Sequence, residues 1–288
     1  MKTQLSLRER LAKGEFVLTV EMEPPAGSDP SQTLAEIGPL TERFAAVNIA
    51  DSPMATLRMS PIALAYLIQE KWGLEVIFHL TCRDRNLLGL QAELLGAAAL
   101  GVQNILALTG DPPENGDHPS ATGVFDVDSV GLIAMADSLN RGVALSQKEL
   151  AAPTDFFIGT VANPTAPDLA AEVARLERKA KAGAGFVQTQ PIFSPEQFER
   201  FQAATAHLQL PILYGILPLK NFRSAKYLAE KVPGINIPAE VLERVKSGNS
   251  EEGVLIAREI LAYLRTRAAG AHIFPMGKPE LALKVIGE

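Results

Sequence analysis

Residues 16–25 read FVLTVEMEPP, an apolar run that ends in two glutamates and two prolines. The apolar and partly β-branched side chains predict a strand that is buried on both faces, as in a parallel sheet covered by helices. Pro24 and Pro25 cannot continue a hydrogen-bonded ladder, so the strand ends just after Glu21 and Glu23. A carboxylate at the end of a buried strand is costly to desolvate, which makes it a candidate for function.

The same arrangement of strand, polar residue, turn and helix repeats along the chain. Further strands are expected over 45–50, 75–80, 104–108, 155–161, 185–190, 211–217 and 271–274. Helices are expected over 5–13, 60–72, 87–98, 128–140, 169–180, 225–231 and 251–267, with others after Pro30 and at the C-terminus. A spacing of about 25 to 35 residues between strands is typical of βα units.

We therefore predict a (β/α)8 barrel in which residues 1–288 form a single catalytic domain. A doubly wound open sheet is the alternative fold. It is disfavoured because Pro24 and Pro25 occupy the first turn, where that fold carries the pattern G-x-G-x-x-G.

Composition narrows the class of protein. Hydrophobic residues make up 47% of the 288 residues, and the net charge of −6 argues against nucleic acid or a membrane surface as the main partner. The chain shows no apolar signal core and no run of about 18 apolar residues, so we expect a cytoplasmic protein. Cys82 is the single cysteine, which excludes a disulfide framework and a four-thiolate metal site within this chain.

In a barrel, functional side chains lie at the carboxyl ends of the strands. The expected ends carry Glu21, Glu23, Asp51, His79, Thr81, Thr109, Asp111, Asn163, Gln188 and Gln190. Glu21 lies deeper in its strand than Glu23, and burial raises the pKa of a carboxyl group. We predict that Glu21 is a general acid, with a buried ion pair to an arginine or lysine as the alternative.

Other candidates have a structural alternative of their own. His79 is either a core histidine or a ligand contact, and the other three histidines lack the spacing of metal ligands, so no metal site is expected. Asp111 is either a turn residue or a carboxylate that faces a ligand. Phe222 either staples the start of a helix or stacks on a planar ligand. The residues alone thus predict a barrel enzyme with an acid after the first strand and a polar rim for a heterocyclic ligand.

Five segments carry a family resemblance, and their combination is more specific than any one of them. They are VEMEPP at 20–25, HLTC at 79–82, ALTGDPP at 107–113, KAGAGFVQTQPIF at 181–193 and GILPLKNF at 215–222. Here the chain resembles the methylenetetrahydrofolate reductase family of flavin-dependent (β/α)8 barrels, over nearly its whole length. The resemblance implies reduction of 5,10-methylenetetrahydrofolate to 5-methyltetrahydrofolate, with FAD rather than FMN as cofactor and NADH or NADPH as electron donor.

The resemblance also implies roles for individual residues. Glu21 matches the acid that protonates the bridging nitrogen of the substrate and opens its five-membered ring. Asp111 and Gln190 match residues that hold the pterin, and Asp111 is counted with Glu21 as catalytic. Flavin contacts are implied for His79, Thr81, Asp111, Asp126, Asn163, Glu172 and Lys179, and folate or nicotinamide contacts for Gln190, Phe222 and Lys278. From the residues alone, Lys179 is nearly as well explained as a solvated helix lysine.

Three positions depart from the family pattern. Ala50-Asp51-Ser52 stand where relatives often carry Thr-Tyr-Gly, Thr109 replaces an arginine of some relatives, and Asn163 replaces a tyrosine. These changes affect the contacts to the phosphate end of the flavin and leave the choice between FAD and FMN open. They do not touch the acid or the pterin contacts.

Two alternative functions stay open at this point. One is a flavin- or folate-binding barrel that needs a partner subunit to supply electrons. The other is a different flavin barrel such as proline dehydrogenase, which is disfavoured because it would not need the Glu21 acid. A homo-oligomer is expected in either case.

Overall fold

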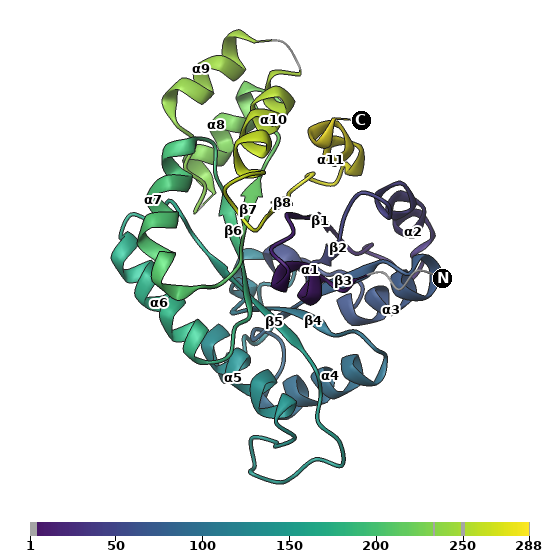
Figure 1. Cartoon of the computed structure of the whole chain (residues 1–288). Coiled ribbons are helices and arrows are strands. Elements are labelled where there is room, and N and C mark those ends of the chain that lie inside the picture. The colour runs from purple at the N-terminus through teal and green to yellow at the C-terminus, as the bar shows by residue number, and fades with distance from the viewer. Residues whose placement is uncertain (1–4, 233, 249–250, 288) are drawn as a thin grey trace. The chain divides into compact units, whose positions relative to one another are not determined.

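The computed structural model of the chain describes residues 5–232, 234–248 and 251–287. Eight parallel strands follow one another in sequence order around a closed barrel (Figure 1). They are β1 (Val17–Met22), β2 (Ala46–Ile49), β3 (Glu75–Thr81), β4 (Asn104–Leu108), β5 (Phe157–Ala162), β6 (Phe186–Pro191), β7 (Ile212–Ile216) and β8 (Gly270–Ile273). The predicted (β/α)8 barrel is confirmed.

Helices alternate with the strands. They are α1 (Leu7–Ala12), α2 (Ser31–Ile37), α3 (Pro61–Trp72), α4 (Leu87–Ala99), α5 (Ser129–Asn140), α6 (Leu169–Lys181), α7 (Pro195–Thr205), α8 (Phe222–Lys231), α9 (Ala239–Ser247), α10 (Glu252–Leu264) and α11 (Pro279–Ile286). Neither α7 nor α9 is among the helices expected from the sequence.

The residues group into two compact units, which are described in turn. The β2–β5 unit comprises Glu21–Val161 and Arg178–Phe186, and the β6–β8 unit comprises the remaining described residues, 5–20, 162–177 and 187–287. The assignment of residues 1–288 to one catalytic domain stays a prediction.

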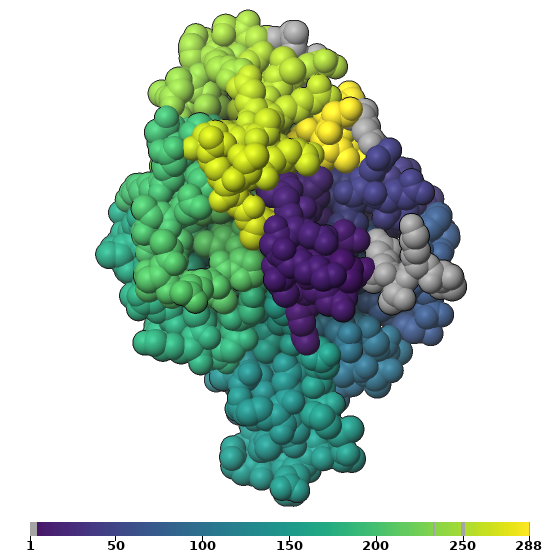
Figure 2. Space-filling model, viewed as in Figure 1, coloured from purple at the N-terminus to yellow at the C-terminus, as the bar shows by residue number. Residues whose placement is uncertain are grey.

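In the β2–β5 unit, α3, α4 and α5 lie outside their strands (Figure 1). Asn86 caps α4 and Asp128 caps α5, because each side chain accepts the backbone N–H three residues on. The segment between α5 and β5 forms the teal protrusion at the lower edge of Figure 2, where Val143 and Glu149 form an isolated antiparallel bridge. The strands β2, β3 and β4 pair in parallel, with Ile49 opposite Phe78 and Thr81 opposite Leu108.

In the β6–β8 unit, β7 lies between β6 and β8, and β8 pairs with β1. An apolar cluster that includes Leu219, Ile237 and Ile256 joins the segments after β7 to α8, α9 and α10. Within the described residues, no helix combines the length and the apolar character that a membrane crossing requires.

Candidate active site

Glu21 is the penultimate residue of β1, and its side chain is half-buried. Burial, and secondarily the negative charge of Glu23, raises the pKa of Glu21 from 4.5 to about 7. Glu23 is exposed and pairs with Arg58 at 3.4 Å. Glu21 itself has no ion-pair partner within the described residues, so the ion-pair alternative finds no support. A half-protonated carboxyl at neutral pH can both give and take a proton.

His79 is buried in β3, and its Nε2 lies 3.0 Å from Nδ2 of Asn48 in β2. Burial lowers the pKa of His79 to about 4, against the opposing attraction of Asp51. The imidazole is therefore neutral at pH 7. Because the amide Nδ2 of Asn48 is a donor, Nε2 accepts and the ring proton is on Nδ1. The sequence singled out His79 but missed Asn48, whose partner lies 31 residues away.

Asp51 follows β2 and is buried at 5% exposure. Its Oδ2 accepts the backbone N–H of Thr81 and the Thr81 hydroxyl, both at 2.9 Å. Arg85 adds a two-pronged ion pair, with Nη1 at 2.8 Å from Oδ2 and Nη2 at 3.3 Å from Oδ1. A buried carboxylate is tolerated when it is paired and hydrogen-bonded in this way. The departure from the family pattern at position 51 is thus a structural anchor for the end of β3.

Gly110 brings the end of β4 against the end of β3. Its φ is +93°, and a Cβ at this position would lie 2.9 Å from the Cβ of Thr81, so only glycine fits. Asp111, which follows, is exposed. Asp111 therefore directly follows the residue at which the chain after β4 packs against Thr81.

Two other predicted flavin contacts have structural partners. Asp126 Oδ2 accepts the backbone N–H of Leu87 at 3.0 Å, at the start of α4. Lys179 is buried at 4% exposure, and its Nζ donates to the carbonyl oxygen of Val161 at 2.7 Å. The alternative of a solvated helix lysine is wrong, because a cation buried at the end of β5 is held there by backbone acceptors.

The β6–β8 unit has its own buried polar cluster, formed by Gln188, Thr19 and His272. Thr19 Oγ1 lies 2.9 Å from His272 Nδ1, and Gln188 Nε2 donates to Thr19 Oγ1 at 3.1 Å. The sequence pointed to Gln188 alone, because Thr19 and His272 lie inside their strands rather than at the ends.

Gln190 is exposed although it belongs to β6, because the strand register shifts between Gln188 and Pro191. Such a bulge re-aims a side chain. Gly215 of β7 permits it, since a Cβ there would lie 2.5 Å from the Thr189 carbonyl oxygen. Gly215 also donates its N–H to Thr189 Oγ1 at 2.9 Å.

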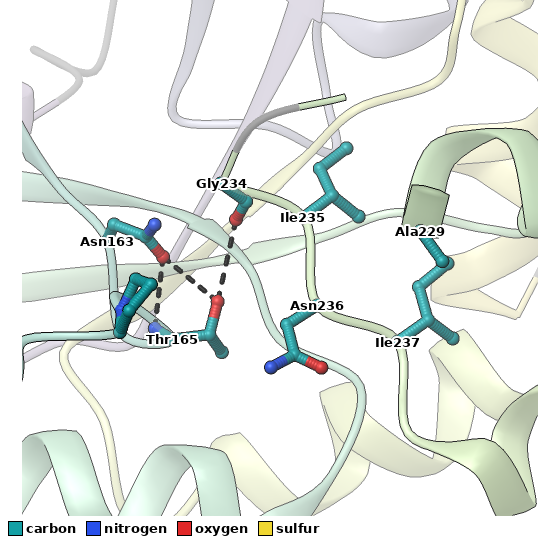
Figure 3. A pocket seen from close by; sticks show the side chains of 8 residues that line it. Asn163, Thr165, Ala229, Gly234, Ile235, Asn236 and Ile237 are labelled. Carbon is teal, nitrogen blue, oxygen red and sulfur yellow. Dashed lines mark hydrogen bonds between the residues drawn. The ribbon is translucent and has the colours of Figure 1, made fainter. Parts of the chain in front are cut away.

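A pocket of about 370 Å³ lies between the segment after β5 and the α8–α9 connection (Figure 3). Asn163 Oδ1 accepts the backbone N–H of Thr165 at 3.0 Å. The Thr165 hydroxyl lies 3.0 Å from the same oxygen and 3.5 Å from the Gly234 carbonyl oxygen. None of the described residues that line this pocket carries a charged side chain. A Cβ on Gly234 would lie 3.8 Å from Cγ of Gln190, so Gln190 lies beside one of the residues that line the pocket.

The remaining predicted contacts of this unit lie elsewhere. Glu172 Oε1 accepts the Asn163 N–H at 2.8 Å, which ties α6 to the end of β5. Phe222 is half-buried against the α8–α10 apolar cluster, with Lys246 Nζ at 6.0 Å from its ring centre. This packing is compatible with the staple role of Phe222, and its stacking on a planar ligand stays a prediction. Lys278 is exposed at the start of α11.

Within the described parts of the chain, no three histidine, cysteine, aspartate or glutamate side chains are grouped as metal ligands. Active sites of (β/α)8 barrels lie at the carboxyl ends of the strands, where this chain carries the protonatable carboxyl of Glu21 and several buried polar groups, so the arrangement is that of an enzyme barrel. The family model described as methylenetetrahydrofolate reductase matches residues 6–287, and the chain belongs to this family.

Curated relatives agree with this assignment. The 5,10-methylenetetrahydrofolate reductases of Salmonella typhimurium and Escherichia coli K12 are each 27% identical over 299 residues, which cover 97% of this chain and 93% of theirs. Methylenetetrahydrofolate reductase 2 of Schizosaccharomyces pombe is 27% identical over 207 residues, 66% of this chain but 30% of the relative.

Solved structures share the fold. A Clostridium thermocellum protein described as binding two copies of 5-methyl-5,6,7,8-tetrahydrofolic acid has a TM-score of 0.66 at 14% identity, covering 97% of this chain and 99% of that one. A 2,3-dimethylmalate lyase has a TM-score of 0.55 at 15% identity, covering 98% and 83%. Such low identity carries the fold alone, because one barrel fold supports many chemistries.

Proposed function

We propose that this chain reduces 5,10-methylenetetrahydrofolate to 5-methyltetrahydrofolate, with electrons that NADH or NADPH delivers through a bound flavin. The observation that carries the proposal is Glu21, a carboxyl with a pKa of about 7 at the end of β1, in a chain of the methylenetetrahydrofolate reductase family. The Clostridium thermocellum barrel, described as binding 5-methyl-5,6,7,8-tetrahydrofolic acid, supports the same substrate class.

Glu21 acts as the general acid. An ordinary glutamate would be almost fully ionised at pH 7, whereas Glu21 keeps its proton in about half of the molecules. It gives that proton to the bridging nitrogen of the folate, which opens the five-membered ring and makes the one-carbon unit electrophilic. General acid catalysis of this kind is typically worth about 10² to 10⁴ in rate.

The residues present fit the ring system of a flavin. The bound flavin supplies hydride transfer. His79 offers an Nδ1–H donor, Thr81 offers a hydroxyl oxygen, and Asn163 lines an uncharged pocket within the size range of small-molecule sites. We assign the flavin ring to His79 and Thr81. Asp111 and Gln190 then hold the pterin, as the resemblance implies.

The phosphate end of the flavin fits less directly. Arg83 is paired with Asp84 at 2.8 Å and Arg85 with Asp51, and Lys179 donates to a backbone carbonyl. In this proposal, neutral donors such as the side-chain amide of Asn163 therefore make more of the phosphate and ribityl contacts than these charged side chains do. FAD rather than FMN remains the expected cofactor.

Two half-reactions share one flavin, so the nicotinamide donor and the folate bind in turn and the kinetics are ping-pong. The purified protein should be yellow, should bleach anaerobically with NADH or NADPH, and should recover its colour with 5,10-methylenetetrahydrofolate. Glu21→Gln should still bleach but should recover slowly. A yellow protein that ignores both donors would instead indicate a partner subunit that supplies electrons, and a protein that binds folate but no flavin would refute the proposal.

A further inference from the structure

The hydroxyl of Thr81 donates its proton in a hydrogen bond to another side chain of the protein. Asp51 Oδ2 lies 2.9 Å from Thr81 Oγ1, and an ionised carboxylate can only accept hydrogen bonds. The Thr81 hydroxyl must therefore be the donor in this contact. The oxygen keeps its lone pairs for a further partner, but it has no second proton to offer.

Arg85 and the Thr81 backbone hold Asp51 in this role. The carboxylate receives the Thr81 N–H at 2.9 Å and both terminal nitrogens of Arg85, at 2.8 and 3.3 Å. A two-pronged contact to a guanidinium fixes the carboxylate plane as well as its charge. Asp51 is 5% exposed and Thr81 is 3% exposed, so water competes little with these bonds. The hydroxyl cannot turn around without losing a charge-assisted hydrogen bond.

His79 adds a donor on the same face of β3. Residues two apart on a strand point to the same side, and His79 and Thr81 are so related. His79 offers its Nδ1–H because Nε2 accepts from Asn48. The face therefore presents one donor and one acceptor, which is the complement of a ring edge with a carbonyl oxygen beside an N–H.

We propose that Thr81 accepts a hydrogen bond from a ring N–H of the bound heterocycle, and that Asp51 and Arg85 are positioning residues that fix this polarity. The inference rests on the proposed function and deepens it. The N–H is that of an amide or imide group in the ring, and both the flavin and the pterin contain such a group. The experiment below tests which of the two rings donates this hydrogen bond.

The first arm of the test uses flavin-free full-length protein titrated with riboflavin and with riboflavin methylated at the imide nitrogen. The wild-type chain should prefer riboflavin by roughly tenfold or more, since methylation leaves the buried Thr81 oxygen without its hydrogen bond. Thr81→Val should lose most of this preference, and Thr81→Ser should keep it. Asp51→Ala should also reduce it, because the hydroxyl is then free to rotate; thermal melting checks that this variant is folded.

An equal affinity of the wild-type chain for both flavins, or an unchanged preference in Thr81→Val, overturns the flavin assignment. The second arm measures binding of 5-methyltetrahydrofolate to wild type and Thr81→Val in the same way. A loss confined to this arm assigns the N–H to the pterin, and no loss in either arm overturns the inference. A wild-type chain that binds no flavin at all refutes the proposed function, and the second arm then decides the role of Thr81 alone.

Discussion

Replacement of Glu21 by glutamine should make the protein more stable at alkaline pH relative to the wild type. In the folded protein the pKa of Glu21 is raised from 4.5 to about 7 by burial. Between these two pH values the folded chain keeps a proton that the unfolded chain has already released. The free energy of unfolding therefore falls as the pH rises through this interval. Glutamine has the same shape and never ionises, so the variant is spared this loss.

The size of the effect follows from the pKa. A rise from 4.5 to about 7 corresponds to roughly 3 kcal/mol, at about 1.4 kcal/mol for each pH unit. This is an upper bound, because the side chain is half-buried and water reaches part of it. Below pH 4.5 the two proteins should differ little from this cause. By pH 8 the variant should have gained up to about 3 kcal/mol on the wild type.

Urea unfolding of both proteins at several pH values from 4 to 8.5 measures this difference. Glu23→Gln is the matched control, because Glu23 is exposed and its pairing with Arg58 at 3.4 Å is a surface contact. Removal of the Glu23 charge should also lower the pKa of Glu21 slightly, since that charge is the second cause of the raised value. Wild-type and Glu21→Gln stabilities that run parallel over the whole pH range would show that Glu21 titrates normally, and the general acid would then be another group.

Three further predictions concern other side chains. Gln190→Leu should weaken folate binding by about 1–3 kcal/mol without slowing flavin reduction, and a stopped-flow titration with unchanged folate affinity would exclude Gln190 from the site. Phe222→Ala should lower the melting temperature, since the ring packs against the α8–α10 cluster. If the ring also stacks on ligands, the same variant should bind both nicotinamide and folate more weakly. Normal kinetics would show that Phe222 only packs. Tyr214→Phe should raise the free energy of unfolding by about 1 kcal/mol, because the buried hydroxyl has no hydrogen-bond partner among the residues that the structure describes. Tyr263→Phe, whose hydroxyl bonds Glu199, should not, and a destabilised Tyr214→Phe would reveal an unrecognised partner.

The barrel was predictable because its signal is local and repeated. Each strand is an apolar run that ends in a polar residue and a turn, and the predicted 104–108 strand coincides with β4. The two missed helices, α7 and α9, have ordinary helix starts: Ser194 caps α7 with Pro195 at its first position, and Pro238 precedes α9. Phe198 and Phe201 recur at helical spacing in α7, a periodicity that the sequence pattern does contain.

Candidate residues at strand ends were predictable for the same reason, but their partners were not. Nothing local in the sequence indicates that Asp51 meets Arg85, that Asn48 meets His79, or that Lys179 donates to a carbonyl at the end of β5. These contacts join residues 18 to 34 positions apart, across neighbouring strands and helices. The cluster against which the Phe222 ring packs could not be predicted either, since it is built partly by the unexpected α9.

The partners decide what each strand end can offer to a ligand. A side chain that reaches the rim of a barrel has a buried neighbour behind it, and that neighbour takes up part of its hydrogen-bonding capacity. Thr81 becomes an acceptor because Asp51 holds its proton, and His79 becomes a donor because Asn48 occupies Nε2. The residue types at the rim can be predicted from the sequence. Whether each of them donates or accepts a hydrogen bond with a ligand depends on the buried residue behind it, as Asp51 lies behind Thr81 and Asn48 behind His79. The residue at position 51, which departs from the family pattern, therefore bears on ligand recognition through the hydroxyl of Thr81, whose proton Asp51 accepts.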